Sequence, residues 1–342
     1  MKPYVVLYDD DQNVRGGDAN DAIAARDSAE TSKAVRAALS ALGRVEMVET
    51  LDGDPVSLSR RLAEIEPEVV FNLAEAARGV AELEACVAGL LELLGVAFTG
   101  NTSQTLALCL DKPKTKALLR GSGVPVPAGL VLRNAENDSL QGLEFPAIVK
   151  PAFMDASHGI EPANVVFDER SARLKAKELL RRFPPAVIVE QFIDGREINV
   201  SVAELGAGPE VLPLSEIDWQ LPAGVPRVCG YEAKWVEGTE AFLKTQIICP
   251  ANVSHQLDRR IRQVALAAFE AVSCRDYARV DMRVDSEDNP VVLEVNPNPC
   301  IAPGAGLARS AGVAGWSYDD LIRRFVANAA ARGPIAPLGR SR

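Results

Sequence analysis

Histidine is scarce in this sequence, with only His158 and His255 among 342 residues. A metal site built from imidazole groups is therefore nearly excluded. The six cysteines are scattered along the chain, and no two of them form a C-x-x-C pair. This spacing favours reduced thiols over disulfide bonds or zinc ligands.

Long apolar runs are also missing. No stretch approaches the roughly 18–20 uninterrupted apolar residues that a membrane-spanning helix needs. The first apolar segment, from Tyr4 to Tyr8, is too short for the hydrophobic region of a signal peptide. We therefore expect a cytoplasmic protein with no membrane partner.

An excess of positive charge is absent as well, since the formal net charge is −10 at pH 7. Binding to nucleic-acid phosphates draws on clustered lysine and arginine, so we expect no nucleic-acid partner, although local basic pockets stay open as a possibility. A chain of 342 residues is too long for one compact core and predicts two or three domains around a cleft, a size that suits an enzyme.

Alternating strands and helices predict a parallel, doubly wound sheet in the N-terminal part. The expected strands are 4–8, 45–49 and 68–73, and the expected helix is 30–43, ending at Gly43. Further along, strands 146–151 and 186–193 bracket a helix at 169–183, which predicts a small α+β unit. The predicted division is an N-terminal domain at 1–104, a central unit at 105–185, a C-terminal unit at 186–331 and a disordered tail at 332–342.

Two acidic residues interrupt apolar strands near the end of the chain. Side chains alternate along a strand, so Arg279, Asp281 and Arg283 share one face of strand 278–285. Glu294 and Asn296 likewise share a face of the next strand. If residues 286–289 form a four-residue hairpin loop, Asp285 pairs with Pro290, Asp281 with Glu294, and Arg279 with Asn296.

Opposed carboxylates destabilise a sheet by roughly 0.2–1 kcal/mol, and more when partly buried, so a positive group is expected between them. Mg²⁺ is one candidate, because carboxylate and amide oxygens are the ligands it prefers. The alternative is a solvent-exposed hairpin face that Arg279 and Arg283 neutralise. The spacing alone leaves both readings open.

No G-x-x-x-x-G-K-[ST] motif occurs, so a bound nucleotide needs another phosphate cradle. Lys150 ends an apolar strand, an unusual place for a charge, and the small residues that follow it offer backbone N–H groups for phosphate oxygens. Lys112 precedes a helix that has Pro113 near its first turn. Each lysine taken alone is more often a solvated surface residue.

A series of motifs follows in a fixed order between about residues 68 and 325: LLELLGVAFTGN, LDKPKTKALLRGSGVPVP, FPAIVKP, VIVEQFIDGREINV, YEAKW, DYARVDMRV and LEVNPNP. In this order they resemble ATP-grasp ligases, specifically those similar to D-alanine–D-alanine ligase. The resemblance implies an ATP-grasp fold that follows a Rossmann-like N-terminal domain. It also implies that ATP and Mg²⁺, for which Mn²⁺ can substitute, are the cofactors, and that the protein can form a homodimer.

The resemblance also implies roles for individual residues. Lys112, Lys150 and Lys234 match lysines that contact the ATP phosphates, and the loop that contains Ser157 closes over them. The segment from Glu190 through Gln191 to Ile193 matches the hinge that binds adenine through its backbone, and Glu197 matches the acid that binds the ribose. Asp281, Glu294 and Asn296 match the Mg²⁺ ligands, while Arg279 matches the residue beside the reacting acyl group, which makes Arg279, Lys234 and Ser157 the expected catalytic residues.

Several residues near the expected substrates depart from the family pattern. Ala156 precedes Ser157 where the family has paired serines, and Trp235 stands where it usually has tyrosine. Cys300 and Ala305 replace a glycine and a serine. These changes predict an amide-forming ligase whose carboxylate and amine substrates are amino-acid-like compounds other than two D-alanines.

Other residues and functions leave alternatives open. Glu75 fits either a substrate ammonium group or an exposed acid, Arg15 fits either the cleft or a solvated turn, and Cys300 is interpreted as a packing residue. The rival functions are an ATP-binding regulator without ligase activity and an ATP-grasp kinase that phosphorylates its substrate without ligation. Retention of Arg279 beside the metal-type residues argues against the regulator.

Overall fold

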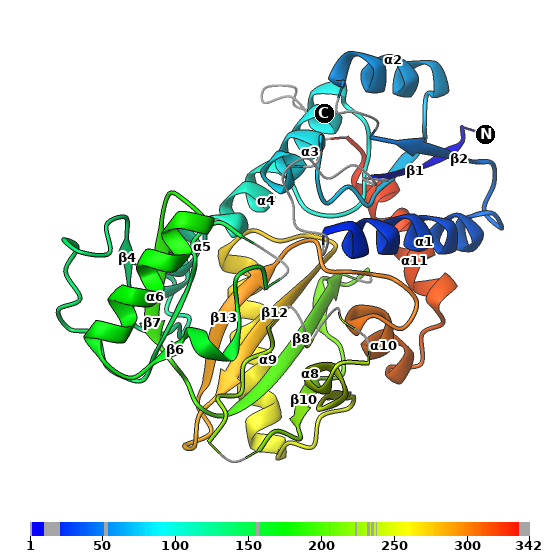
Figure 1. Ribbon diagram of the computed structural model, residues 1–342. Helices are drawn as coiled ribbons and strands as arrows, with labels where there is room; N and C mark the ends of the chain where they lie inside the picture. The colour runs from blue at the N-terminus through cyan, green and yellow to red at the C-terminus, as the bar shows by residue number, and fades with distance from the viewer. Residues whose placement is uncertain are drawn as a thin grey trace.

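The computed structural model describes residues 2–9, 21–50, 54–78, 80–154, 157–204, 206–222, 224–230, 233, 236 and 238–334. Its strands form three separate sheets (Figure 1). Within these ranges, no helix combines the length and the apolar character that crossing a membrane requires.

The N-terminal sheet is parallel, with the strand order β2-β1-β3. Both of its faces are covered, because Val6 packs against Val35 and Leu39 while Val5 and Leu7 belong to the core on the opposite face. This arrangement confirms the predicted doubly wound sheet. Its elements are β1 (Tyr4–Tyr8), α1 (Asp21–Leu39), β2 (Val45–Glu49), α2 (Pro55–Ile65), β3 (Val69–Asn72), η2 (Ala81–Leu83), α3 (Glu84–Leu94) and α4 (Ser103–Leu110).

The helix predicted at 30–43 has different ends in the structure, where α1 begins at Asp21 and its last residue is Leu39. Ser40 donates its backbone N–H to both the Arg36 and the Ala37 carbonyl oxygens, and the Leu42 N–H donates to Leu39. These contacts tighten the chain into a turn before Gly43, so the glycine lies beyond the helix and does not cap it.

The smaller sheet has the order β4-β7-β5-β6, and helix α6 covers one of its faces (Figure 1). The Asp168 carboxylate and the Ser171 hydroxyl form a capping box that starts α6. Because β7 pairs with both β4 and β5, the predicted division at residue 185 is wrong. The elements are β4 (Gly129–Leu132), β5 (Ala147–Pro151), η3 (Pro162–Asn164), β6 (Val165–Val166), α6 (Glu169–Arg182) and β7 (Val187–Gln191).

The larger sheet has the order β11-β10-β8-β12-β13, with β9 paired to β8. Helix α9 packs against it through Leu257, Ile261 and Phe269. Cys109 and Leu119 join the same core, so the predicted start of the central unit at residue 105 is also wrong. The elements are α5 (Lys112–Gly121), β8 (Arg196–Glu204), β9 (Pro209–Val211), β10 (Ser215–Trp219), α8 (Glu240–Leu243), β11 (Thr245–Ile248), α9 (His255–Ala271), β12 (Tyr277–Val284), β13 (Pro290–Asn296), α10 (Gly306–Val313) and α11 (Tyr318–Arg332).

Helix α11 ties the N-terminal sheet to the larger sheet, and Figure 1 shows it beside α1. Arg332, at its last turn, binds the fully buried Asp276 carboxylate through Nη1 at 2.6 Å and Nη2 at 2.9 Å. The same carboxylate accepts the Gly100 N–H at 2.7 Å. Arg332 therefore ends a packed helix and does not begin a disordered tail; residues 335–342 of that predicted tail lie outside the described residues.

Replacing Arg332 with alanine should lower the free energy of unfolding by about 2–4 kcal/mol, because the buried Asp276 carboxylate would lose its bidentate guanidinium partner. Urea unfolding followed by circular dichroism measures this change. Arg181→Ala is the matched control, since Arg181 lies exposed in the last turn of α6. Equal stabilities of the two variants would contradict the structural role given to Arg332.

Candidate active site

The hairpin of β12 and β13 brings the two predicted acids together. Asp281 lies opposite Glu294, and Arg279 lies opposite Asn296, as the sequence predicts. The predicted pairing of Asp285 with Pro290 is wrong, because Val284 occupies that place. Between the two regions the register shifts by a β-bulge, which leaves Leu293 as the extra residue of β13.

The hairpin loop explains this difference. The Asp285 carboxylate accepts hydrogen bonds from the backbone N–H groups of Glu287 and Asn289, both at 2.9 Å. An aspartate that caps its own turn in this way leaves the strand ladder and joins the loop. The loop therefore comprises residues 285–289, and the bulge at Leu293 restores the opposition of Asp281 and Glu294.

The facing acids lie among positive and amide groups. The Arg279 guanidinium donates to both Asp281 oxygens, at 2.7 and 2.8 Å, and Asn199 donates to Asp281 Oδ1 at 2.9 Å. Burial opposes the charge of Arg279, but the Asp281 carboxylate outweighs it and raises the pKa of Arg279. Lys112 Nζ lies 3.7 Å from Glu294 Oε2.

The alternative of an exposed hairpin face is wrong, since Asp281 and Arg283 are each only 4% exposed. Arg283 does not neutralise this acid pair. It binds Glu197 instead, with 2.7 Å between Nη2 and Oε2, and donates to the Ile193 carbonyl oxygen at 3.2 Å.

The oxygen donors of this hairpin fit a hard divalent cation such as Mg²⁺. Asp281 and Glu294 supply facing carboxylates, and Asn296 supplies an amide oxygen that accepts the Asn298 N–H at 3.0 Å. In the part of the chain that the structure describes, no group of three or more His, Cys, Asp or Glu side chains is placed to hold a metal ion, and the hairpin itself offers two carboxylates and one amide. The donor chemistry matches Mg²⁺, and the ligand assignment stays a prediction.

A cavity between the two C-terminal sheets collects most of the remaining predicted residues. Its lining includes Lys150, Ser157, Glu190, Gln191, Ile193, Glu197, Asp281 and Glu294, together with apolar walls from Ile148, Ile160 and Leu293. Lys112 adjoins it, since its ammonium lies 3.7 Å from Oε2 of Glu294, and it also donates to the Met154 carbonyl oxygen at 2.5 Å. Lys234 and Trp235 lie outside the described residues, so the role predicted for Lys234 stays a prediction.

Two backbone N–H groups of the hinge already form hydrogen bonds within the protein. The Gln191 N–H donates to the Ala128 carbonyl oxygen at 2.8 Å, and the Phe192 N–H donates to the Pro146 carbonyl oxygen at 2.9 Å. These bonds fix the path of the segment between the smaller and the larger sheet. Its predicted contacts with adenine stay a prediction.

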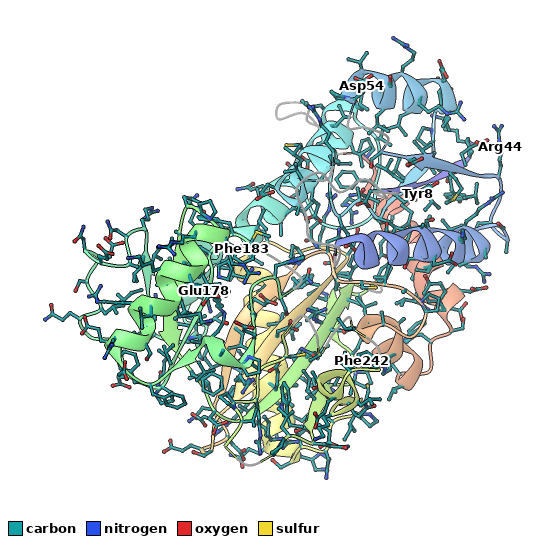
Figure 2. All side chains as sticks on the ribbon, in the orientation of Figure 1. Tyr8, Arg44, Asp54, Glu178, Phe183 and Phe242 are labelled. Carbon is teal, nitrogen blue, oxygen red and sulfur yellow. The ribbon has the colours of Figure 1, made fainter. Side chains whose placement is uncertain are left out.

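The loop beside the cavity has a strained backbone in its described part. Ser157 has a positive φ of 63°, and its hydroxyl donates to the Cys229 carbonyl oxygen at 3.2 Å. Gly159 has a φ of +68°, and a Cβ atom there would lie 2.5 Å from the Phe183 ring, which Figure 2 labels. Glycine is therefore required at 159, both for the backbone conformation and for the approach of the ring.

Sequence reasoning missed Lys116, which is buried behind the cavity. Its ammonium lies 3.0 Å from Glu190 Oε2, while Lys150 lies 2.6 Å from Glu190 Oε1. Lys116 also donates to the Leu293 carbonyl oxygen at 2.8 Å. Its position four residues after Lys112, on the same face of α5, is the signal that could have identified it.

Burial shapes the charges of this cluster. It lowers the pKa of Lys116 to about 8, against the opposing attraction of Glu190. For Glu190, burial alone would raise the pKa, but the two ammonium groups outweigh it and hold the pKa below its usual range. The cluster therefore keeps a buried carboxylate ionised between two lysines.

Glu75 and Asn298 lie where the N-terminal domain meets the rest of the protein. Glu75 is exposed and donates its backbone N–H to the buried Asp9 carboxylate at 3.2 Å. Asn298 follows β13, the strand of Glu294 and Asn296, and joins it to the N-terminal domain. It donates to Glu84 Oε1 at 2.6 Å and to the Ala74 carbonyl oxygen at 3.1 Å. Arg15 lies outside the described residues.

Comparisons with known proteins agree with this geometry. Residues 118–327 match the family model described as D-ala D-ala ligase C-terminus. A D-alanine–D-alanine ligase of Herminiimonas arsenicoxydans is 32% identical over 303 residues, which cover 87% of this chain and 86% of that protein. An uncharacterised protein, y4sG, of Sinorhizobium fredii is 35% identical over 255 residues, or 74% of this chain and 72% of that protein.

A solved structure of a D-alanine–D-alanine ligase from Bacillus anthracis, complexed with ATP, superposes with a TM-score of 0.74 at 22% identity, over 97% of this chain and 98% of that one. The fold is therefore the ATP-grasp fold. The chain belongs to the D-alanine–D-alanine ligase family, a family of ATP-dependent ligases that form carbon–nitrogen bonds.

Deprotonation of Lys116 should make stability depend on pH. The folded state releases this proton near pH 8 and the unfolded state near its ordinary pKa of 10.5, so the unfolded state binds more protons between these values. The free energy of unfolding of the wild type should therefore rise with pH, relative to Lys116→Met, by up to about 3 kcal/mol across this interval.

Denaturant unfolding at a series of pH values measures the difference. Lys114→Met is the control, since Lys114 lies exposed on the same helix and should give a constant offset from the wild type. A constant offset for Lys116→Met as well would contradict the lowered pKa.

Proposed function

We propose that this protein is an ATP-dependent carboxylate–amine ligase that forms an amide bond through an acyl phosphate, on amino-acid-like substrates. The observation that carries this proposal is the single cavity in which Lys150, Glu190, Glu197, Asp281 and Glu294 converge. A metal-bound nucleoside triphosphate requires an apolar wall for its base, positive side chains for its phosphates and oxygen ligands for its metal ion. The cavity offers all three.

ATP would occupy this cavity with its base against the apolar wall. Ile148, Ile160 and Leu293 provide that wall, next to the hinge from Glu190 to Ile193. The Bacillus anthracis neighbour of the same fold is complexed with ATP, which supports the assignment. Lys112 and Lys150, which are 4% and 6% exposed, would hold phosphate oxygens as point charges.

Asp281, Glu294 and Asn296 would hold Mg²⁺. When bound, this ion supplies positive charge that offsets the negative charge on the β- and γ-phosphates. Mn²⁺ prefers similar oxygen ligands and would substitute for it.

The chemistry has two steps. A substrate carboxylate oxygen attacks the γ-phosphorus of ATP, which forms an acyl phosphate as ADP leaves. The substrate amine then attacks the acyl carbon, loses a proton and expels inorganic phosphate. Lys150 would keep the phosphate in line, and closure of the loop around Ser157 would exclude the water that hydrolyses the intermediate.

Arg279 would stabilise the oxyanion of the second step. Its Nε and Nη2 atoms donate to the two Asp281 oxygens, and this bidentate contact fixes the guanidinium plane. A donor held in place before the reaction needs no reorganisation as charge develops, which is why it lowers the barrier.

We propose substrates other than two D-alanines, on the strength of Cys300, Ala305 and Trp235 standing where the family pattern has other residues. The buried Asp9 at the end of β1 adds a carboxylate at the ligand edge of the N-terminal sheet. The curated relatives from Herminiimonas arsenicoxydans and Frankia casuarinae are named D-alanine–D-alanine ligases. Two D-alanines are therefore the first pair to test.

The deciding measurement is ADP release with ATP and Mg²⁺ across amino acids given singly and in pairs, with the products identified by mass spectrometry. A product that joins both compounds, formed only when both are present, is the expected result. Phosphorylated product without an amine requirement would identify a kinase instead. Tight ATP binding with no turnover for any pair would identify a regulator.

Asp281→Asn and Glu294→Gln should each lower turnover by at least about 10²–10³-fold, because each removes one of the two carboxylates proposed to hold Mg²⁺. Their circular dichroism spectra should match that of the wild type. Glu287→Gln, in the exposed hairpin loop, should keep full activity and serves as the control. Wild-type turnover in either test variant would overturn the metal assignment.

A further inference from the structure

Lys116 has no place in the proposed chemistry, yet it connects three elements of the site. It stands on α5, and its ammonium contacts Glu190 on β7 and the Leu293 carbonyl oxygen on β13. Glu190 and Leu293 both line the cavity. Lys116 therefore acts from behind the cavity wall, on two residues that form it.

The contact with the Leu293 carbonyl oxygen supports the β-bulge. The extra residue of a bulge falls outside the regular ladder, so its carbonyl oxygen needs another partner when it is buried. Lys116 provides that partner to Leu293 at 2.8 Å. Because the bulge sets the register, this hydrogen bond also holds Glu294 opposite Asp281.

The contact with Glu190 sets the net charge around Lys150, where the phosphates of the nucleotide would lie. Lys150 lies 2.6 Å from Glu190 Oε1, and by itself this pair would be neutral and would attract a phosphate weakly. Lys116 lies 3.0 Å from the other oxygen, Oε2. With two lysines and one glutamate the cluster carries one net positive charge, so Lys150 remains attractive to a phosphate.

We propose that Lys116 is a positioning residue that couples the metal-ligand strand to the nucleotide hinge. It holds the Leu293 bulge, which places Glu294, and it neutralises Glu190, which leaves Lys150 for phosphate. The inference rests on the proposed function, since it concerns how the same cavity binds a nucleotide and a divalent cation.

Lys116→Met separates this role from simple packing. Methionine fills a similar volume, and Glu190 keeps Lys150 as its partner, so no buried charge is left alone. The variant should fold with a circular dichroism spectrum like that of the wild type. Lys114→Met is the matched control, because Lys114 lies exposed on the same helix.

The experiment measures the dissociation constant of ADP by calorimetry, with and without Mg²⁺, and needs no turnover. Lys116→Met should weaken ADP binding about 10–100-fold, the effect expected from losing one charged contact. It should also reduce the gain in ADP affinity that Mg²⁺ gives the wild type, because Glu294 is no longer held in register. Lys114→Met should match the wild type in both measurements.

Two results would overturn the inference. One is a folded Lys116→Met that binds ADP like the wild type and keeps the full Mg²⁺ effect. The other is a variant that loses thermal stability while its folded fraction binds normally, which would make Lys116 a packing residue. If Lys116→Met does not fold, Lys116→Gln takes its place, because glutamine keeps a donor for the Leu293 carbonyl oxygen but lacks the charge. Weaker ADP binding by this variant without Mg²⁺ supports the inference. Unchanged binding refutes it.

Failure of the proposed function has a separate signature. In that case wild-type protein itself would bind ADP weakly and show no response to Mg²⁺. Normal binding by the wild type and an unchanged Lys116→Met would refute the positioning role alone.

Discussion

Two carboxylates face each other across a mostly buried hairpin, and the surrounding structure compensates their repulsion. Arg279 and Asn199 bind Asp281, while Lys112 approaches Glu294. Behind them, Lys116 fixes the backbone of β13 beside Glu294. Opposed acids of this kind would weaken an ordinary sheet. Here they are held by residues from α5, β8 and β12, which supports the proposal that their proximity serves binding and not folding.

The sequence predicted the opposition of Asp281 and Glu294 through the period-two alternation of side chains. It assumed a loop of residues 286–289, whereas Asp285 caps its own turn and lengthens the loop. The bulge at Leu293 shifts the register back, so Asp281 faces Glu294 as predicted. Pro290, which lies before the bulge, faces Val284 and not the predicted Asp285. A bulge depends on partners distant in sequence, here the ammonium of Lys116, so local patterns could not reveal it. Local patterns did place the apolar strands and the lysines at 112 and 150.

Long-range pairing accounts for the other differences. The apolar segment around Val189 reads as a strand in any sheet, and only its pairing with β4 and β5 assigns it to the smaller one. Glu190 shows the same limit. Sequence reasoning assigned it a role only through the backbone of the hinge, but the structure buries its side chain between two lysines, and neither lysine is adjacent to it in sequence. Arg332 resembled the start of a polar tail because Asp276, its partner, is distant in the chain.

The shared core of the first and last helices has a consequence for how the chain matures on the ribosome. Phe71 and Leu39 near the beginning pack in one cluster with Ile322 and Phe325 near the end. While the nascent polypeptide is still growing, only α1 of these two helices can cover that face of the first sheet, so the apolar side chains that α11 later buries meet water. The opposite face can consolidate early through Leu62 and Leu91. Final closure must await synthesis of α11, which makes the incomplete intermediate a natural client for chaperones.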